Sequence, residues 1–357
     1  MPREDKMKRE EVDFACVIHP LNLQLLSEAF EDGLKRKRDS IVKRILHWVP
    51  PFKCSIITGI YSKDTNKKIK GALISYILLP EQILSSSQAY LVNKLIKTVK
   101  FAQEKLKAKI IGLEAYLPQI DKRGMYLRKA LNVPITTGRN YSVAIVKKSI
   151  IKIAEKIGRD LSSLKIAIVG ATGSIGKICS KIFSKRVGYL YLIARNEQRL
   201  KNLAQTLKKD LAEIVITTNV SEGIKEADIV ITTTNTPYEI VDVSFLKPGA
   251  IVFDVSLPRN ISQKCAESRK DILVIDAGIV RPPGNPDFHF YFGLPPGLCY
   301  ACMAETMILA LEERYESYSM GANVSEKRVE EIEKLGDKHG FELIEFMSYG
   351  RQVEIRK

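Results

Sequence analysis

The chain contains 357 residues, and its 56 Lys and Arg residues against 41 Asp and Glu residues give a formal net charge of +15. This length favours two domains with a helical appendage and allows substantial buried cores. The first residues are charged and no apolar run is as long as a membrane span. These features predict no signal peptide and no transmembrane segment, and therefore a cytoplasmic protein. The six cysteines are scattered, which favours free thiols over a disulfide framework.

The positive charge is concentrated in the N-terminal part of the chain. One interpretation is an acidic partner, whether nucleic acid, an anionic membrane or an acidic protein; the other is solubility alone. The basic clusters are Lys35–Arg38, Lys43–Arg44, Lys67–Lys70 and the lysines from Lys94 to Lys109.

Residues 1–147 are predicted to form a first domain of α/β or α+β type, because strand-like runs alternate with helical periodicity. Leu91, Leu95 and Val99 share one face of a predicted helix over residues 90–107, which carries lysines elsewhere. A hydroxyl-rich turn at Thr136–Gly138 is expected to lead into a strand over residues 142–146. The other predicted elements are strands over residues 14–18, 54–61, 69–79 and 110–113 and a helix over residues 21–38.

A helix over residues 148–161 is predicted to connect this unit to a second domain. There, short apolar strands alternate with helical patterns, which is typical of a doubly wound parallel sheet with a Rossmann nucleotide-binding fold. In such a sheet the loops after the carboxyl ends of the strands form the ligand crevice. The predicted strands cover residues 165–169, 189–194, 213–217, 228–233, 250–254 and 272–275.

A glycine-rich turn follows the first of these strands. Its spacing, Gly170-x-x-Gly173-x-x-Gly176, departs from the strict G-x-G-x-x-G pattern, with Thr172 where the second glycine would fall. Such a turn lets backbone amides approach a pyrophosphate at the positive end of a helix dipole. Glycines at this spacing also occur in ordinary loops and helix caps. The expected cofactor contacts here are Gly170, Thr172, Gly173, Ser174, Ile175 and Gly176.

The second strand of this domain ends at Arg195 and Asn196, nineteen residues or more beyond Gly176. An NAD-binding fold would carry an acidic residue there for the ribose hydroxyls, whereas an arginine offers a charged fork to a 2′-phosphate. The alternative is a solvated arginine at a strand end. We therefore predict NADPH as the cofactor, held by Arg195 and Asn196. Thr234, after the fourth strand, is expected to touch nicotinamide or ribose, unless it lies in an ordinary turn.

The C-terminal part begins with a loop over residues 281–297, rich in Pro, Gly and aromatic residues and long enough for a lid. An apolar helix is predicted over residues 298–318. A second, amphipathic helix is predicted from its N-cap Ser325 to His339, ending at Gly340.

Cys299 and Cys302 lie where the apolar helix begins. A cysteine in a first helical turn can have its pKa lowered by the helix dipole, which would make Cys302 a nucleophile. The alternatives are a zinc site, which lacks further ligands here, a redox dithiol, and burial as a small hydrophobic residue. No metal site is expected. Glu305 could orient Cys302 or relay a proton, although a helix-surface or capping role is expected instead. The four histidines are predicted to be surface or loop residues, with His289 the best candidate for catalysis.

Over nearly its full length the chain resembles the long-chain acyl-(acyl carrier protein) reductases of cyanobacteria. That family reduces fatty acyl thioesters to aldehydes with NADPH through a cysteine acyl-enzyme, and its reactive cysteine matches Cys302. The resemblance therefore implies acyl carrier protein or acyl-CoA as the substrate carrier and an aldehyde-consuming enzyme downstream, with no nucleic acid partner. The segments that carry it are Val169–Gly176, Ala194–Leu200, Thr136–Gly138, Tyr300–Glu305 and Lys338–Phe341.

The expected organisation is an N-terminal substrate and partner domain over residues 1–147, a Rossmann NADPH-binding domain over 148–290 and a C-terminal helical segment over 291–357 that carries the reactive cysteine. The basic candidates for docking an acidic carrier protein are the helix from Lys94 to Lys107 and the cluster Lys35–Arg38. Two other functions stay open. One is reduction of another acyl or aminoacyl thioester or ester, as by a glutamyl-tRNA reductase; the other is a non-catalytic NADP-binding interaction module.

Overall fold

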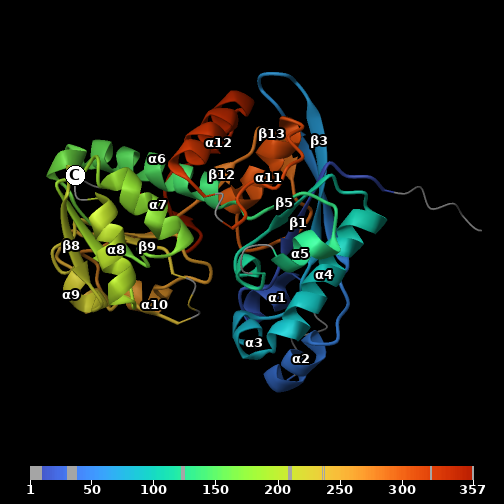
Figure 1. Ribbon diagram of the computed structural model, residues 1–357, viewed down its shortest axis with the longest axis horizontal. Helices are drawn as coiled ribbons and strands as arrows, with labels where there is room; N and C mark the ends of the chain where they lie inside the picture. Colours follow the sequence, from blue (N-terminus) through green and yellow to red (C-terminus); the bar gives the residue numbers. More distant parts are fainter. Residues whose placement is uncertain are drawn as a thin grey trace, which may run out of the picture.

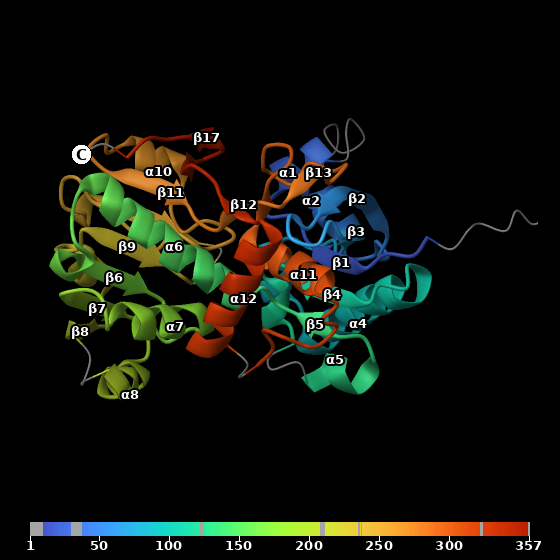
Figure 2. The ribbon, with the colours of Figure 1, turned by 90° about the horizontal axis from the view of Figure 1, so that it is seen from above.

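The structure is a computed structural model that describes residues 10–29, 38–121, 125–207, 211–234, 236, 238–321 and 324–355. Figure 1 shows a mixed α/β molecule in which two sheets lie side by side, with α12 between them, α6 along the left-hand half and α11 in the right-hand half. The view from above in Figure 2 agrees with this placement. The predicted fold class is confirmed. No helix in the described part of the chain is long and apolar enough to cross a membrane.

The described helices, in chain order, are α1 (Leu23–Ala29), α2 (Asp39–Leu46), α3 (Pro80–Ser85), α4 (Gln88–Lys105), α5 (Met125–Ala130), α6 (Arg139–Ile157), α7 (Ser174–Phe183), α8 (Glu197–Leu207), α9 (Val220–Ile224), α10 (Gln263–Glu267), α11 (Ala301–Leu311) and α12 (Glu326–His339). The helix predicted over residues 21–38 is α1 as far as Ala29; its remainder to residue 37 lies outside the described residues.

The N-terminal sheet has the strand order β13-β2-β3-β1-β4-β5. Its alternating side chains form two cores: Phe14, Cys16 and Ile110 face α11, whereas Ala15 and Ile111 face the side covered by α4. The strands are β1 (Phe14–Ile18), β2 (Lys53–Tyr61), β3 (Lys68–Ser75), β4 (Ile110–Leu113), β5 (Ile135–Thr136) and β13 (Gly284–Asp287); β1 is parallel to β3 and β4, and β2 is antiparallel to β3 and β13.

The second sheet has the order β17-β16-β11-β10-β9-β6-β7-β8. Its six parallel strands, counted along the chain, lie in the order 3-2-1-4-5-6 of a Rossmann fold, so the topological switch point falls between β6 and β9. The strands are β6 (Lys165–Val169), β7 (Tyr189–Ile193), β8 (Glu213–Thr217), β9 (Ile229–Thr232), β10 (Ile251–Asp254) and β11 (Leu273–Asp276), with β16 (Met347–Ser348) and β17 (Arg351–Gln352) on the edge.

The strand predicted over residues 142–146 is wrong, because these residues belong to the long helix α6. α6 packs against α7, α11 and α12, so it is buried on several sides. Val143, Ala144, Ile145 and Val146 are all buried, and a run of buried residues without a polar stripe has no helical period to recognise. The separate connecting helix predicted from residue 148 is the second half of α6.

The segment predicted as a loop over residues 281–297 contains strand structure. β12 (Ile279–Arg281) forms a small sheet with β14 (Cys299–Tyr300) and β15 (Glu342–Leu343), and β13 pairs with β2. Gly59 and Gly284 permit this pairing, because a Cβ at Gly59 would lie 1.8 Å from the Asn285 carbonyl oxygen. The partner strand is more than 200 residues away in the sequence, so local pattern could not reveal it.

The two C-terminal helices differ in how well their ends were predicted. α11 ends at Leu311, earlier than predicted, and Glu313 follows it in the left-handed conformation with φ 55°. α12 has the predicted ends: the Ser325 side chain accepts a hydrogen bond from the Arg328 amide, and Gly340 follows with φ 90°.

Candidate active site

The glycine-rich turn lies at the carboxyl end of β6, where the chain turns into α7. Gly170 has φ 89°, and a Cβ at Gly176 would lie 2.3 Å from the Gly170 carbonyl oxygen. The Thr233 hydroxyl donates a hydrogen bond of 3.0 Å to the Val169 carbonyl and so joins β6 to the end of β9. Because side chains are excluded from this cradle, the first amides of α7 are accessible to an anion.

The neighbouring strand ends carry the other predicted cofactor residues. Arg195 is exposed after β7 and forms no ion pair with any described residue. Asn196 follows it and accepts a hydrogen bond of 2.9 Å from the Arg199 amide, which caps α8. The Thr234 hydroxyl donates to Asn260 at 2.6 Å. Thr172 lies in the turn itself, and Ser174 and Ile175 are the first two residues of α7. The structure thus brings the predicted set together at the switch point, and these residues fit a dinucleotide.

Cys302 occupies the first turn of α11, as predicted, and lines an apolar pocket with an empty volume of about 720 Å³ including its mouth. The walls come from both halves of the molecule. Leu257, from the loop after β10, adds a residue of the Rossmann sheet. Other walls come from the end of β1, from α1, from the segment after β3 and from the segment after β13; their residues include Ile18, Leu25, Leu26, Ile77, Phe290 and Phe292.

The predicted direction of the Cys302 pKa shift is wrong. Burial raises the pKa of this thiol well above its usual value, and the neighbouring Glu114 carboxylate raises it further. A hydrogen bond with the Ala115 backbone opposes this shift. Desolvation therefore outweighs the favourable helix dipole, and the isolated site holds Cys302 as a thiol. Cys299, unlike the partly exposed Cys302, is fully buried, and burial raises its pKa well above its usual value.

Glu114 is a functional candidate that the sequence reasoning missed. It follows β4 directly and is 5% exposed, at the inner end of the same pocket as Cys302. Burial raises the pKa of its carboxyl to about 7, although interactions with the Cys302 and Cys16 thiols partly oppose this rise. The signal was present in the sequence: an acidic residue follows an apolar strand, where the ligands of parallel sheets bind.

Of the two roles predicted for Glu305, the capping role is confirmed and the helix-surface role is wrong, because Glu305 is fully buried. Its carboxylate accepts a hydrogen bond from the Thr136 hydroxyl and one of 2.9 Å from the Tyr141 amide in the first turn of α6. The carboxyl lies at the start of α6, where the helix dipole favours its charged form, although burial raises its pKa above the usual value. Glu305 therefore fixes α11 to α6.

Two of the four histidines are buried, contrary to the prediction. His19 lines the Cys302 pocket, and its ring nitrogens contact the Pro20 carbonyl at 3.0 Å and the Tyr116 amide at 3.2 Å. Since the Tyr116 amide donates to Nε2, His19 is neutral, and burial lowers its pKa to about 4. His289 is exposed, lies 3.2 Å from an Asp287 oxygen and is not part of the pocket wall.

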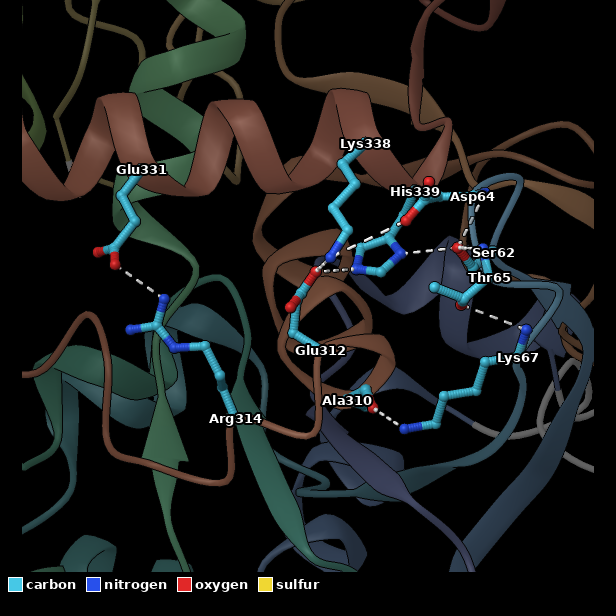
Figure 3. Close-up of polar contacts among 10 residues, drawn as sticks. All are labelled: Ser62, Asp64, Thr65, Lys67, Ala310, Glu312, Arg314, Glu331, Lys338 and His339. Atoms are coloured by element: carbon cyan, nitrogen blue, oxygen red, sulfur yellow. Dashed lines mark hydrogen bonds and ion pairs between the residues drawn. The ribbon is translucent and has the colours of Figure 1, made fainter.

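His339 is the second buried histidine, and Figure 3 shows its surroundings. Its Nδ1 lies 2.8 Å from the Ser62 hydroxyl and its Nε2 lies 2.9 Å from a Glu312 oxygen, while Lys338 pairs with the same carboxylate. These contacts join the β2–β3 turn to the ends of α11 and α12. His339 does not line the Cys302 pocket, so its role is structural.

Gly138 packs directly against Cys302. This glycine precedes α6 with φ 68°, and a Cβ placed on it would lie 2.1 Å from the Cys302 Cα. The starts of α6 and α11 therefore meet backbone to backbone, and Gly138 sets the position of the cysteine.

Comparisons with known proteins agree with this geometry. Residues 152–277 match the family model for shikimate/quinate 5-dehydrogenase. The long-chain acyl-[acyl-carrier-protein] reductase of Synechococcus elongatus is 27% identical over 293 residues, which cover 78% of this chain and 84% of that protein.

Two further relatives match smaller shares of their own length. The aminotransferase PigE of Serratia sp. is 25% identical over 300 residues, 81% of this chain but only 34% of that protein. The glutamyl-tRNA reductase of Acaryochloris marina is 22% identical over 170 residues, 46% of this chain and 39% of that protein. Together with the Rossmann topology, these likenesses indicate an NAD(P)-dependent oxidoreductase that uses a nicotinamide cofactor.

The contact between Gly138 and Cys302 can be tested with a matched control at the other end of α6. Gly138→Ala should lower the free energy of unfolding by more than Gly158→Ala, because Gly158 has a similar φ of 70° but a Cβ added there would meet no atom within 4 Å. The left-handed backbone costs about 1–2 kcal/mol in both variants, and overpacking adds about 1–3 kcal/mol at Gly138. Urea unfolding measures both, and equal losses would contradict the close packing.

Proposed function

We propose that this protein reduces a long-chain fatty acyl thioester to the fatty aldehyde with NADPH, through an acyl-enzyme on Cys302. The observation that carries the proposal is the position of Cys302, a cysteine in a first helical turn that opens into an apolar pocket. That pocket includes Leu257 from the edge of the Rossmann sheet where a dinucleotide binds. The likeness to the acyl-[acyl-carrier-protein] reductase over most of both chains supports the same reaction.

In the proposed reaction, Cys302 and the apolar pocket have separate roles. The Cys302 sulfur attacks the carbonyl carbon of the thioester, and the bond from that carbon to the departing thiol breaks, which leaves the acyl group on Cys302. The apolar pocket holds the acyl chain, and each buried methylene contributes about 0.8 kcal/mol. When bound, NADPH supplies the hydride that reduces the acyl group to the aldehyde. The pocket walls exclude water, which would otherwise hydrolyse the acyl-enzyme.

The preference for NADPH rests on Arg195. Its exposed guanidinium forms no ion pair with a described residue, and it lies at the strand end where an NAD-binding fold has an acid. A free guanidinium offers two parallel donors to a 2′-phosphate. Gly170, Gly173 and Gly176 would hold the pyrophosphate.

Reduction of an aminoacyl ester is the second candidate, and the likeness to a glutamyl-tRNA reductase favours it. The apolar walls of the Cys302 pocket favour the long acyl chain instead, because a charged or polar aminoacyl group would lose its hydration there. Incubation with palmitoyl thioester and NADPH, followed by mass spectrometry, separates the candidates. An acyl adduct and aldehyde support the proposal; no reaction with long acyl chains supports the second candidate or a non-catalytic NADP-binding module.

The expected carrier is an acidic acyl carrier protein, and α4 provides a basic surface for it. Lys94 does not belong to that surface, because its ammonium is half-buried and donates a hydrogen bond of 2.8 Å to the Val49 carbonyl. Lys97 and Lys100 are exposed, and Lys100 only forms a 3.6 Å contact with Glu104. Of the second predicted cluster, Lys35, Arg36 and Lys37 lie outside the described residues.

The first prediction concerns the nucleophile. Cys302→Ser should abolish both the acyl adduct and aldehyde formation while NADPH still binds, because a serine hydroxyl forms no comparable anion at neutral pH. Cys299→Ser is the control and should retain most activity, since Cys299 is fully buried on β14. Intact-mass spectrometry and aldehyde assay give the readouts. Exchange of the two phenotypes would assign the reaction to Cys299.

The second prediction concerns cofactor choice. Arg195→Ala should weaken NADPH binding by about 1.5–3 kcal/mol, the strength of a hydrogen bond to a charged group, and leave NADH binding nearly unchanged. Fluorescence titration measures both affinities. Arg199→Ala, an exposed arginine in α8, serves as the control for loss of charge. Equal weakening of both cofactors by Arg195→Ala would show that Arg195 does not meet the 2′-phosphate.

The third prediction concerns the carrier. Replacing Lys97 and Lys100 by Glu should raise the KM for acyl carrier protein substrate far more than the KM for the matching acyl-CoA, because only the protein carrier has an acidic surface to steer. The difference should shrink above about 0.1 M salt, where the Debye length falls below about 10 Å. Replacing Lys327 and Lys334, exposed on α12, gives a charge-matched control. Equal effects of the two pairs would exclude α4 as the docking surface.

A further inference from the structure

Glu114 is a buried carboxylate that no contact in the fold accounts for. Neither of its side-chain oxygens receives a well-aligned hydrogen bond from the described residues. A buried acid without such partners costs several kcal/mol if it is ionised, so folds that keep one usually use it. By contrast, the buried Glu305, one turn after Cys302, has both oxygens occupied by α6 and the turn before it.

The packing around Glu114 places its carboxylate beside α11, the helix that carries Cys302. β4 lies parallel to β1, with Cys16 opposite Gly112, and this face of the sheet is covered by α11. Gly112 has no side chain to separate the strand from the helix: a Cβ there would lie 2.3 Å from the Thr306 hydroxyl and 2.6 Å from a Glu114 oxygen. Glu114 and Cys302 line one pocket, and each side chain shifts the pKa of the other: the carboxylate raises the pKa of the thiol, and the thiol lowers that of the carboxyl.

We propose that Glu114 is the base that accepts the proton of the Cys302 thiol as the sulfur attacks the thioester carbonyl. In this step the S–H bond breaks, the proton moves to a Glu114 oxygen and a bond forms from sulfur to the carbonyl carbon. The bond from that carbon to the departing thiolate then breaks, and Glu114 returns the proton to the departing sulfur. Glu114 ends the step as a carboxylate, so no further acid, base or redox partner is needed.

This arrangement resolves the difficulty of a nucleophile whose thiolate is disfavoured by burial. A carboxyl with a pKa of about 7 is half ionised at neutral pH. Much of it is therefore available as a base, and that base is strong enough to accept the thiol proton. The other titratable groups that shift the pKa of Glu114 or of Cys302 are Cys16 on β1, Cys299 on β14 and Glu305 on α11. His19 lines the same pocket but is neutral, with its ring nitrogens in contact with the backbone. Glu114 is thus the base in the pocket that has no structural partner.

The proton transfer can be tested without substrate or cofactor. The result of the test is therefore independent of the proposed function; only the identity of the attacked thioester rests on that function. The probe is iodoacetamide, a small neutral alkylating agent. The rate at which it modifies Cys302 is followed by peptide mass spectrometry between pH 5.5 and 9.5. In the unchanged protein this rate should rise about tenfold from pH 6 to pH 8, because a base is active above its own pKa and is lost as the pH falls through it.

Glu114→Gln gives opposite results under the two possible roles of this residue. If Glu114 accepts the proton, the step near pH 7 disappears and the rate at pH 8 falls at least about tenfold. If Glu114 is only a neighbouring negative charge, its removal lowers the pKa of the Cys302 thiol, so the rate at pH 8 rises. A rise, or a retained step near pH 7, would overturn the proposal.

Two further variants guard against a change in folding. Glu114→Asp should keep a step in the pH profile, shifted in position, because a carboxylate remains. Cys16→Ala removes the other thiol beside Glu114 and should keep the step, moved to higher pH because that thiol lowers the pKa of Glu114. Thermal unfolding of each variant is measured alongside. If Glu114→Gln does not fold, a pH profile of Glu114→Asp identical to that of the unchanged protein would overturn the proposal, and a displaced step would support it.

Discussion

The backbone contact between Gly138 and Cys302 is the constraint on which the rest of the site depends. It brings the starts of two helices, α6 and α11, against each other, and two positive helix ends repel one another. Glu305 offsets this repulsion, because its buried carboxylate belongs to α11 and receives its hydrogen bonds at the start of α6. Since α6 also packs on α7 of the Rossmann sheet, the same joint determines where Cys302 lies relative to the nucleotide-binding edge.

The course of the chain makes the pocket a product of both sheets. After the Rossmann strands, β13 returns to the edge of the N-terminal sheet, α11 covers one face of that sheet, and β16 then adds to the edge of the Rossmann sheet. Leu257, after β10, and Phe290, after β13, therefore line the same Cys302 pocket. The pocket is thus assembled from segments of both sheets and lies next to the Rossmann sheet to which a nicotinamide cofactor is expected to bind.

Burial has two opposing consequences at Cys302. It provides apolar walls that would suit the proposed acyl chain and keep water away, yet it disfavours the thiolate with which the proposed reaction would begin. The helix dipole at the start of α11 does not overcome this desolvation. Proton transfer to a nearby carboxylate would avoid the charged thiolate as a resting state, because the charge stays on Glu114 until the sulfur attacks.

The sequence alone determined the parts whose physics is local. The strand, glycine turn and helix start at residues 165–176, the helix over residues 90–107 and the caps Ser325 and Gly340 follow from period and backbone conformation. Tertiary structure decided the rest. It made residues 142–146 part of a helix by burying them on several sides, and it paired residues 284–287 with a strand more than 200 residues away. It also placed Glu114 beside Cys302 and reversed the expected pKa shift of that thiol, because desolvation depends on what other segments cover a residue and not on its neighbours in the chain.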